Sequence, residues 1–192
     1  MTFEERRLKL VQFNTDWKYP GELEFLKKTL DIRQGESVLD YGCGLGTAVK
    51  YLKEHTLGEI AGYDIENYTG GHPDWFRDRP EGTFDKVYLM HSIGTFEPVW
   101  TELLRINSLL RPGGKVLVIT PNKDFITRFR YETPKGFIVD KDVLRHFTSD
   151  CLEFALKDCG FVVERIGAFG QRHVDGIFER LFIEARTDGQ IP

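Results

Sequence analysis

The sequence has 192 residues, of which 41% are hydrophobic and 29% are charged, a balance typical of a single globular domain. Its net charge of −4 argues against a dedicated nucleic-acid-binding protein, whose domain is usually basic. The 3 scattered cysteines predict neither a disulfide framework nor a zinc site with CxxC spacing. A helix that crosses a bilayer needs about 20 apolar residues, and no apolar run of the sequence approaches this length. The N-terminal sequence also lacks the apolar core of a signal peptide. We therefore expect a soluble, cytoplasmic protein that contacts no membrane.

The N-terminal part of the chain has apolar residues at helical spacing. They fall in residues 3–13 and 21–30, and Tyr19-Pro20-Gly21 separates the two runs, since proline and glycine interrupt helices. We interpret residues 1–34 as a short helical cap or lid that precedes the main domain.

A strand, a glycine turn, a helix and a second strand follow. Residues 36–41 form a short apolar run that stops at Gly42, and the next run with helical spacing starts at Ala48. Gly58 is a suitable end for that helix, and residues 60–64 then read as a strand. This order predicts a βαβ unit with parallel strands.

The same alternation continues toward the C-terminus. Strands are predicted at 84–91, 115–120, 161–166 and 178–186, and helices at 99–110 and 149–159. The last two strands are separated by only 11 residues, too few for a helical crossover, so we expect them to be antiparallel. Residues 187–192 are polar and are predicted to form a frayed tail.

The glycine turn indicates the ligand. Its GxGxG spacing differs from the GxGxxG of dinucleotide sites, because Thr47 occupies the third small position. Asp40 lies two residues before Gly42, at the end of the strand, where an acid would repel a pyrophosphate and suit a cationic amine. Asp64, 22 residues after Gly42, ends the next strand, where a carboxylate can accept hydrogen bonds from both hydroxyls of a ribose. S-adenosylmethionine (SAM) combines a ribose and an amine and has no phosphate.

These residues resemble a known family. Residues 38–46 (VLDYGCGLG) look like motif I of the class I SAM-dependent methyltransferases, and residues 84–87 (FDKV), 109–114 (LLRPGG), 120–122 (TPN), 145–148 (RHFT) and 159–161 (CGF) are similar to later motifs. The resemblance covers residues 35–186, in the expected order, and points to the small-molecule branch. It implies an α/β, Rossmann-like sheet of about seven strands with the last one antiparallel and helices on both faces. It also implies that Gly42, Cys43 and Gly44 line the methionine moiety, that Asp64 holds the ribose, and that Ile65 packs on the adenine.

Two positions depart from the family pattern. Only 19 residues separate Asp64 from Phe84, which shortens the usual helix and third strand, and we interpret Asp74 with Trp75 as the adenine contact there. Phe96 occupies a position where many members of the family have a histidine. The role of that histidine is therefore not assigned to this sequence.

His91 is the candidate catalytic residue. It ends a predicted central strand, where open α/β sheets bind ligands. A general base, a contact to SAM and a satisfied structural histidine all remain open for it.

Residues 121–147 are long for a connection inside a compact domain, which favours a substrate loop or lid. Aromatic side chains gather there without a helical or strand period, at Phe125, Phe129, Tyr131 and Phe137. We predict that these four aromatic side chains fold over the methyl-transfer site, with Phe129 and Tyr131 on the acceptor side, and that the segment around Trp17 and Tyr19 closes the other side.

The sequence therefore predicts an enzyme that transfers a methyl group from SAM to an O or N atom of a small-molecule acceptor, with S-adenosylhomocysteine as the other product. Two alternatives remain open: a protein or RNA methyltransferase, and a SAM-binding protein that has lost catalysis. The chemistry requires no metal. We expect a monomer or a homodimer, and nucleic acid is not the expected partner.

Overall fold

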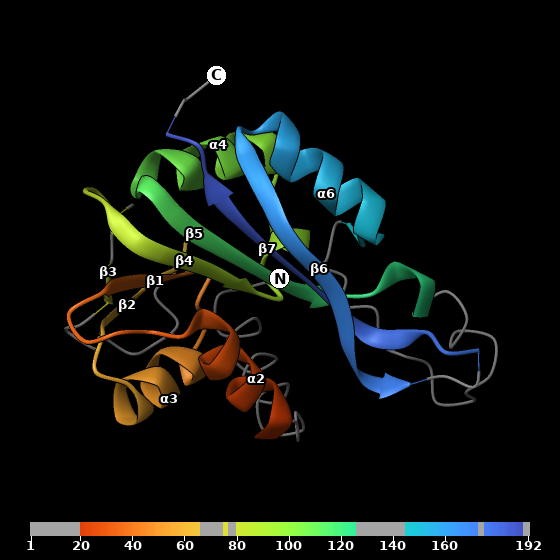
Figure 1. Cartoon of the computed structure of the whole chain (residues 1–192), viewed down its shortest axis with the longest axis horizontal. Helices are drawn as coiled ribbons and strands as arrows, with labels where there is room; N and C mark the ends of the chain where they lie inside the picture. The colour runs from red at the N-terminus through yellow and green to blue at the C-terminus, as the bar shows by residue number, and fades with distance from the viewer. Residues whose placement is uncertain (1–19, 66–74, 77–79, 126–144, 173–174, 190–192) are drawn as a thin grey trace. The chain divides into compact units, whose positions relative to one another are not determined.

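The computed structural model describes residues 20–65, 75–76, 80–125, 145–172 and 175–189 (Figure 1). The chain divides into two compact units, residues 1–81 and 82–192, and each is described by itself. Together the described residues hold seven strands, three in the first unit and four in the second. In the described part of the chain no helix is both long and apolar enough to span a membrane.

The first unit contains the predicted βαβ arrangement. Strand β1 (Ser37–Tyr41) leads through the glycine turn into helix α3 (Thr47–His55), and strand β2 (Glu59–Tyr63) follows. Strands β1 and β2 are parallel and in register from Ser37 opposite Glu59 to Tyr41 opposite Tyr63. The two-residue strand β3 (Trp75–Phe76) pairs with β2, also in parallel. The shortened third strand expected from the sequence is therefore present.

Helix α2 (Pro20–Leu30) belongs to the core of the first unit. Leu26 is fully buried, and Glu24 on α2 accepts a hydrogen bond of 2.7 Å from the Tyr51 hydroxyl on α3. Lys27 forms an ion pair of 2.7 Å with the same carboxylate. Leu26 and Leu30 thus pack α2 within the first unit. The other predicted N-terminal helix, at residues 3–13, lies outside the described residues.

The second unit contains strands β4 (Phe84–Met90), β5 (Leu110–Pro121), β6 (Phe161–Arg172) and β7 (Phe178–Thr187), in the spatial order β4-β5-β7-β6. Strand β5 is parallel to β4 and antiparallel to β7, which is itself antiparallel to β6. The reversed last strand and the antiparallel final pair are both confirmed. Residues 116–120 are all buried, as the uniformly apolar sequence of a central strand predicts.

Helices α4 (Val99–Leu109) and α6 (Ser149–Asp158) lie side by side in the second unit (Figure 1). Asn107 on α4 donates a 2.7 Å hydrogen bond to the carbonyl of Cys159, directly after α6. The Thr187 hydroxyl donates to the Oδ1 atom of the same asparagine at 2.6 Å. Thr187, assigned to the polar tail by the sequence analysis, is thus 2% exposed and ends β7. The correction follows from this buried partner, which hydropathy alone does not reveal.

Two strands are longer than their apolar runs predict. Strand β5 begins at Leu110 instead of Lys115, because the Arg-Pro-Gly-Gly stretch forms an irregularity in the β4–β5 register. Strand β6 continues to Arg172 instead of ending at Ile166, and its extra residues pair with the start of β7. Backbone pairing at a sheet edge does not require apolar side chains, so periodicity does not detect these extensions.

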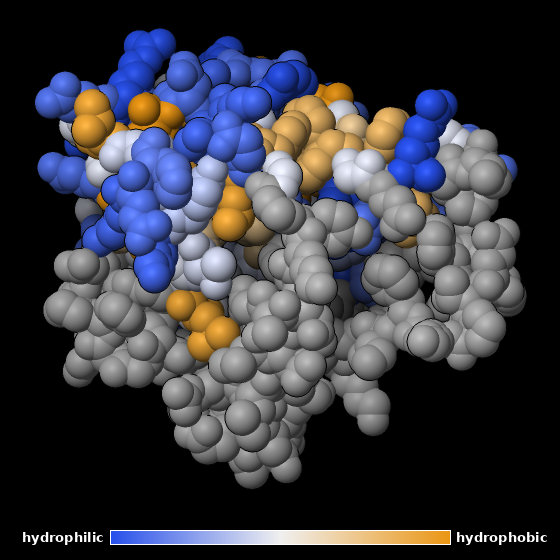
Figure 2. All heavy atoms as spheres, turned by 90° about the horizontal axis from the view of Figure 1, so that it is seen from below, coloured by the Kyte–Doolittle hydropathy of each residue, from blue (hydrophilic) through white to orange (hydrophobic). Residues whose placement is uncertain are grey.

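The described surface is mostly hydrophilic on the face shown in Figure 2, with apolar residues gathered in smaller groups. The large apolar side chains that are exposed include Leu57, Ile65 and Phe154. Scattered exposed apolar residues are ordinary on a folded protein, so only those beside a site carry functional meaning.

Candidate functional site

The glycine turn connects the carboxyl end of β1 to helix α3. Gly42, Gly44 and Gly46 have φ angles of 88°, 53° and 72°, in the left-handed region that side chains rarely adopt. Gly46 is also the N-cap of α3. The GxGxG pattern is therefore required by the backbone, which turns sharply and keeps this surface free of side chains at three positions.

Most amide groups of this turn donate hydrogen bonds within the first unit. The Gly42 and Cys43 amides both donate to the Tyr63 carbonyl, at 2.7 and 2.9 Å, and the Gly46 amide donates to the Cys43 carbonyl at 2.8 Å. The Gly44 amide donates to the Asp64 Oδ2 atom at 2.8 Å. A phosphate-binding turn instead directs successive amides at the anion. This turn is tied to the end of β2 and suits a ligand without a phosphate at this position.

Two carboxylates lie beside the turn. Asp40 is 2% exposed within β1, opposite Gly62 of β2 in the register. Asp64 follows β2 directly and is partly exposed. A carboxylate offers about four acceptor positions, so the bond from the Gly44 amide leaves Asp64 able to accept bonds from the hydroxyls of a ligand.

The Cys43 side chain packs inside the first unit. A β-carbon built at Gly62 would lie 2.9 Å from the Cys43 Sγ atom and 3.0 Å from a methyl of Val49. Burial raises the pKa of the Cys43 thiol, and the nearby Asp40 and Asp64 carboxylates raise it further. The thiol is therefore a neutral packing group. The backbone of Cys43 stands between Gly42 and Gly44 in the turn, so the expectation that Cys43 lines the methionine moiety stays a prediction.

Gly62 is a residue that the sequence analysis missed. It leaves the space that the Cys43 side chain occupies, and it stands opposite both Asp40 in β1 and Trp75 in β3. A glycine in the interior of a predicted strand signals such a close approach.

The predicted adenine contacts are described in part. Ile65 follows Asp64 and is 80% exposed, an unusual state for an isoleucine beside a predicted ligand site. The Trp75 backbone pairs with Gly62 through β3, while Asp74 lies outside the described residues.

His91 directly follows β4, one residue beyond the strand that was predicted to end with it, and belongs to the second unit. Its φ angle is 62°, a left-handed value that is uncommon for residues other than glycine and that clusters at functional sites. The His91 amide donates to the Ile119 carbonyl of β5 at 2.8 Å. A backbone held in this unfavourable conformation is compatible with each of the three roles considered for His91.

Arg145, to which the sequence analysis gave no role, contacts the segment that follows His91. Its Nη1 atom donates to the Phe96 carbonyl at 2.7 Å, and its amide donates to the Gly94 carbonyl at 3.1 Å. Only the position of Arg145 in the 145–148 motif could have drawn attention to it.

The remaining predicted acceptor-side residues lie outside the described part of the chain. They are Tyr19, Phe129 and Tyr131, together with Trp17 and Phe137. Phe125 is described and is 1% exposed, so it contributes to the core of the second unit. No group of three or more potential metal ligands occurs among the described residues.

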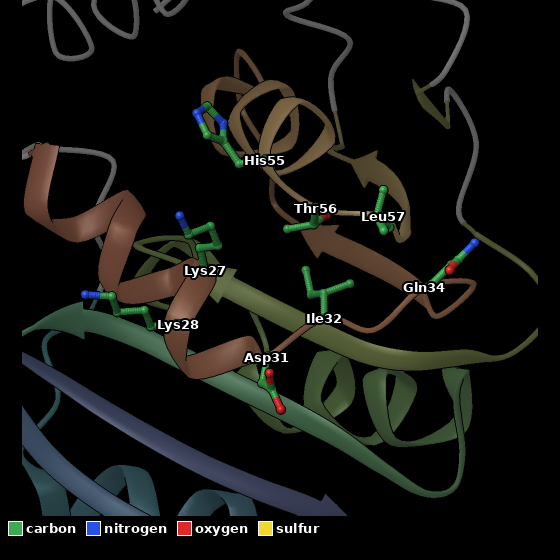
Figure 3. Close-up of a pocket in the computed structure, with 8 residues that line it drawn as sticks. All are labelled: Lys27, Lys28, Asp31, Ile32, Gln34, His55, Thr56 and Leu57. Carbon is green, nitrogen blue, oxygen red and sulfur yellow. The ribbon is translucent and has the colours of Figure 1, made fainter.

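A depression of about 440 Å³ lies elsewhere in the first unit (Figure 3). It is lined by Lys27, Lys28, Asp31, Ile32, Gln34, His55, Thr56 and Leu57. The segments before β1 and β2 form part of it, so it lies at the amino ends of these strands, opposite the glycine turn. Its lysines and histidine stand in the last turns of α2 and α3, where basic residues offset the helix dipole. We therefore do not assign it to the functional site.

A family model described as a methyltransferase domain matches residues 16–166. The chain belongs to the class I SAM-dependent methyltransferases. S-adenosylmethionine is the cofactor of this family. The observed turn, with its inward-directed amides and two adjacent acids, fits such a ligand.

Known methyltransferases share sequence and fold with this chain. Phosphoethanolamine N-methyltransferase 3 of Arabidopsis thaliana is 26% identical over 190 residues, which cover 88% of this chain and 34% of that protein. The chain spans about a third of the length of the first curated relatives that it matches.

Two solved structures have the same fold. A SAM-dependent methyltransferase from Mesorhizobium loti has a TM-score of 0.65 and 20% identity, covering 85% of this chain and 97% of that one. Magnesium protoporphyrin IX methyltransferase from Synechocystis PCC 6803, with bound SAH, has a TM-score of 0.63 and 15% identity. The match covers 97% of this chain and 88% of that one.

Proposed function

We propose that the protein is an enzyme that transfers a methyl group from SAM to an O or N atom of a small-molecule acceptor. The observation that carries this proposal is the glycine turn, whose amides bond to Tyr63 and Asp64 and so leave its glycine surface to a ligand without a phosphate. Membership of the methyltransferase family supports the same conclusion.

The residues beside this turn bind the cofactor in the proposal. Asp40 provides negative charge for the amino group, the backbone of Gly42, Cys43 and Gly44 faces the methionine moiety, and Asp64 accepts bonds from the ribose hydroxyls. Ile65 covers the adenine, and its 80% exposure supports this role. Asp74 and Trp75 complete the adenine contact, and His91 is proposed as a further cofactor contact or a base.

When bound, SAM supplies a methyl group attached to a positively charged sulfur. A nucleophile that attacks the methyl carbon in line with the sulfur would displace the sulfur as a neutral thioether. The protein aligns the nucleophile with the methyl carbon, and positioning of this kind can lower the barrier by several kcal/mol. When the acceptor is a hydroxyl, His91 accepts its proton at an imidazole nitrogen. A neutral amine attacks with its own lone pair and loses its proton after the transfer.

A small-molecule acceptor is supported by the acidic net charge of −4 and by relatives whose names state small substrates, such as phosphoethanolamine and sterols. We further propose that residues 1–34 form a cap, that residues 121–147 form a substrate loop, and that Tyr19, Phe129 and Tyr131 lie on the acceptor side. Cytoplasmic location and a monomeric or homodimeric state complete the proposal.

Calorimetric titration tests the cofactor assignment. The purified protein is titrated separately with SAM, S-adenosylhomocysteine and NADH. We expect saturable binding of both sulfur compounds and none of NADH at equal concentrations. Tighter binding of NADH would refute the proposal.

Acceptor screening tests the enzymatic step. Panels of small amines and hydroxyl compounds are incubated with methyl-labelled SAM beside unmodified protein and RNA extracts. Label in the small-molecule panel supports the proposed acceptor class. Label only in protein or RNA would favour a macromolecular methyltransferase, and binding without transfer to any panel would favour a protein that has lost catalysis.

A further inference from the structure

The segment after His91 is a tightly bonded turn within the second unit. Helix η1 (Ile93–Thr95) begins two residues after His91, and Ile93 is fully buried. The Thr95 hydroxyl and amide both donate to the Ser92 carbonyl, at 2.7 and 2.9 Å. These bonds tie Thr95 to Ser92, so a contact at the end of the turn also restrains the residue that directly follows His91.

Arg145 contacts the end of this turn, at residues 94–97. Its amide donates to the Gly94 carbonyl at 3.1 Å and its Nη1 atom to the Phe96 carbonyl at 2.7 Å. Its Nη2 atom lies 3.8 Å from the Glu97 carboxylate. One residue thus contacts three successive parts of the turn, and a hydrogen bond from a charged donor to a carbonyl is stronger than one between neutral groups.

The backbone next to Arg145 is itself held by hydrogen bonds. Two residues further along, the Phe147 carbonyl accepts a 3.1 Å hydrogen bond from the Lys123 amide, and Phe147 forms a parallel bridge with Asn122. The Asn122 side chain donates to the Phe178 carbonyl at the start of β7, at 2.9 Å. The backbone that carries Arg145 is therefore bonded to the continuation of β5 and to β7.

The other end of the turn is fixed by β5, because the His91 amide donates to the Ile119 carbonyl at 2.8 Å. His91 keeps its unusual φ of 62° between these two attachments. Such a conformation persists only where the surrounding structure imposes it.

We propose that Arg145 is a positioning residue that fixes the orientation of the His91 imidazole through the η1 turn. Its catalytic meaning rests on the proposed function, since His91 is there the proton acceptor or a cofactor contact. Lysine would not replace Arg145 fully, because a single ammonium on a flexible stem lacks the planar fork that reaches Phe96 and Glu97 together.

Nuclear magnetic resonance of protein with carbon-13-labelled histidine tests this assignment. The ring signals of His91 are identified by their loss in His91→Gln, and are then measured in Arg145→Gln and Arg145→Lys. We expect a displaced or broadened His91 ring signal in both variants and an unchanged signal for His55, which lies in the first unit and stacks on Tyr51. The neighbouring His146 is not used as a probe.

Arg111→Gln is the matched control, because Arg111 is also in the second unit and forms a 2.7 Å ion pair with Asp85 at the surface. It should leave the His91 signal in place. An unchanged His91 signal in a folded Arg145 variant would overturn the proposal, and Arg145→Lys serves as the test when circular dichroism shows that Arg145→Gln is unfolded.

Titration of the unmodified protein with S-adenosylhomocysteine reports separately on the proposed function. Failure to bind would refute the methyltransferase proposal without affecting the His91 measurement. Normal binding together with an unmoved His91 signal would refute only the positioning role of Arg145.

Discussion

The carboxylate of Asp64 has two kinds of partner. It accepts a 2.8 Å hydrogen bond from the Gly44 amide, and we propose that it also accepts hydrogen bonds from the ribose hydroxyls. Hydrogen bonds to a charged group contribute about 1.5–3 kcal/mol each. Asp64→Ala should therefore weaken S-adenosylhomocysteine binding at least about tenfold, as measured by calorimetry. Asp64→Asn, whose amide oxygen can still accept from Gly44, should keep the turn intact and lose less affinity.

The control for this pair is Glu54→Ala, which removes an exposed acid from α3 of the same unit. It should bind the cofactor product as the unmodified protein does. Undiminished affinity in a folded Asp64→Ala protein would contradict the ribose assignment.

Gly62 and Cys43 form a packing pair, which predicts coupled effects on stability. Gly62→Ala places a β-carbon 2.9 Å from the Cys43 Sγ atom and should lower the free energy of unfolding by about 1–3 kcal/mol, as overpacking does. Adding Cys43→Ala removes the sulfur and should recover part of this loss, while the contact to Val49 remains. Urea unfolding of the single and double variants measures the coupling.

Gly21→Ala provides the comparison, since a β-carbon there meets nothing within 4 Å. It should leave stability unchanged or raise it slightly, because alanine favours a helix. Strictly additive losses from Gly62→Ala and Cys43→Ala would mean that the two side chains do not compete for one space.

The three thiols should differ in reactivity. Cys151 is exposed, whereas Cys159 is buried and its pKa is raised to about 11, mainly by burial and also by the adjacent Asp158 carboxylate. Only the thiolate reacts with alkylating reagents, so at pH 8 roughly one Cys159 in a thousand is reactive. The pKa of Cys43 is raised as well, so its thiolate population also grows only as the pH rises. Mass spectrometry after brief iodoacetamide treatment should find Cys151 labelled and the other two protected until the protein is unfolded.

At the scale of elements, Asn107 joins α4, the end of α6 and the end of β7 through two buried hydrogen bonds. Asn107→Leu would leave the Cys159 carbonyl and the Thr187 hydroxyl without that partner, at a cost of about 1–3 kcal/mol for each buried group. We expect a clear fall in the urea midpoint. Ser108→Ala removes only an exposed hydroxyl bonded to the Arg105 carbonyl and should leave the midpoint nearly unchanged.

The elements themselves could largely be predicted from the sequence. The runs at 36–41, 99–110 and 149–159 match β1, α4 and α6 to within one residue, because their apolar periodicity reflects real burial. The glycine turn itself could also be predicted, because the left-handed φ angles at Gly42, Gly44 and Gly46 favour glycine, whereas the ligand contacts of these residues stay predictions. The sequence analysis did not anticipate the direction of the Cys43 side chain or the contacts of Arg145 with Phe96 and Gly94. Both depend on partners distant in the sequence, and no local pattern encodes them.

At the scale of the whole molecule, cofactor binding should protect particular segments from hydrogen exchange. With S-adenosylhomocysteine at about 100 times its dissociation constant, the folded state gains about 2.7 kcal/mol by mass action. We expect slower exchange in residues 40–47 and also in residues 121–147 and the segment around Trp17 and Tyr19, which are proposed to close over the site. Protection confined to residues 40–47 would argue against that closure and would favour a macromolecular acceptor.

The internal bonds of the glycine turn also have a kinetic consequence. Because the Tyr63 carbonyl and the Asp64 carboxylate bond to the turn from within the first unit, we expect cofactor binding to require no slow rearrangement of this segment. Association limited only by orientation proceeds at about 10⁵–10⁷ M⁻¹s⁻¹. Variants that loosen the turn, such as Asp64→Ala, should add an ordering step and slow the observed association as well as hasten release. Rapid-mixing fluorescence would then show one more concentration-independent phase than in the unmodified protein, where only the proposed closure over the site contributes such a phase.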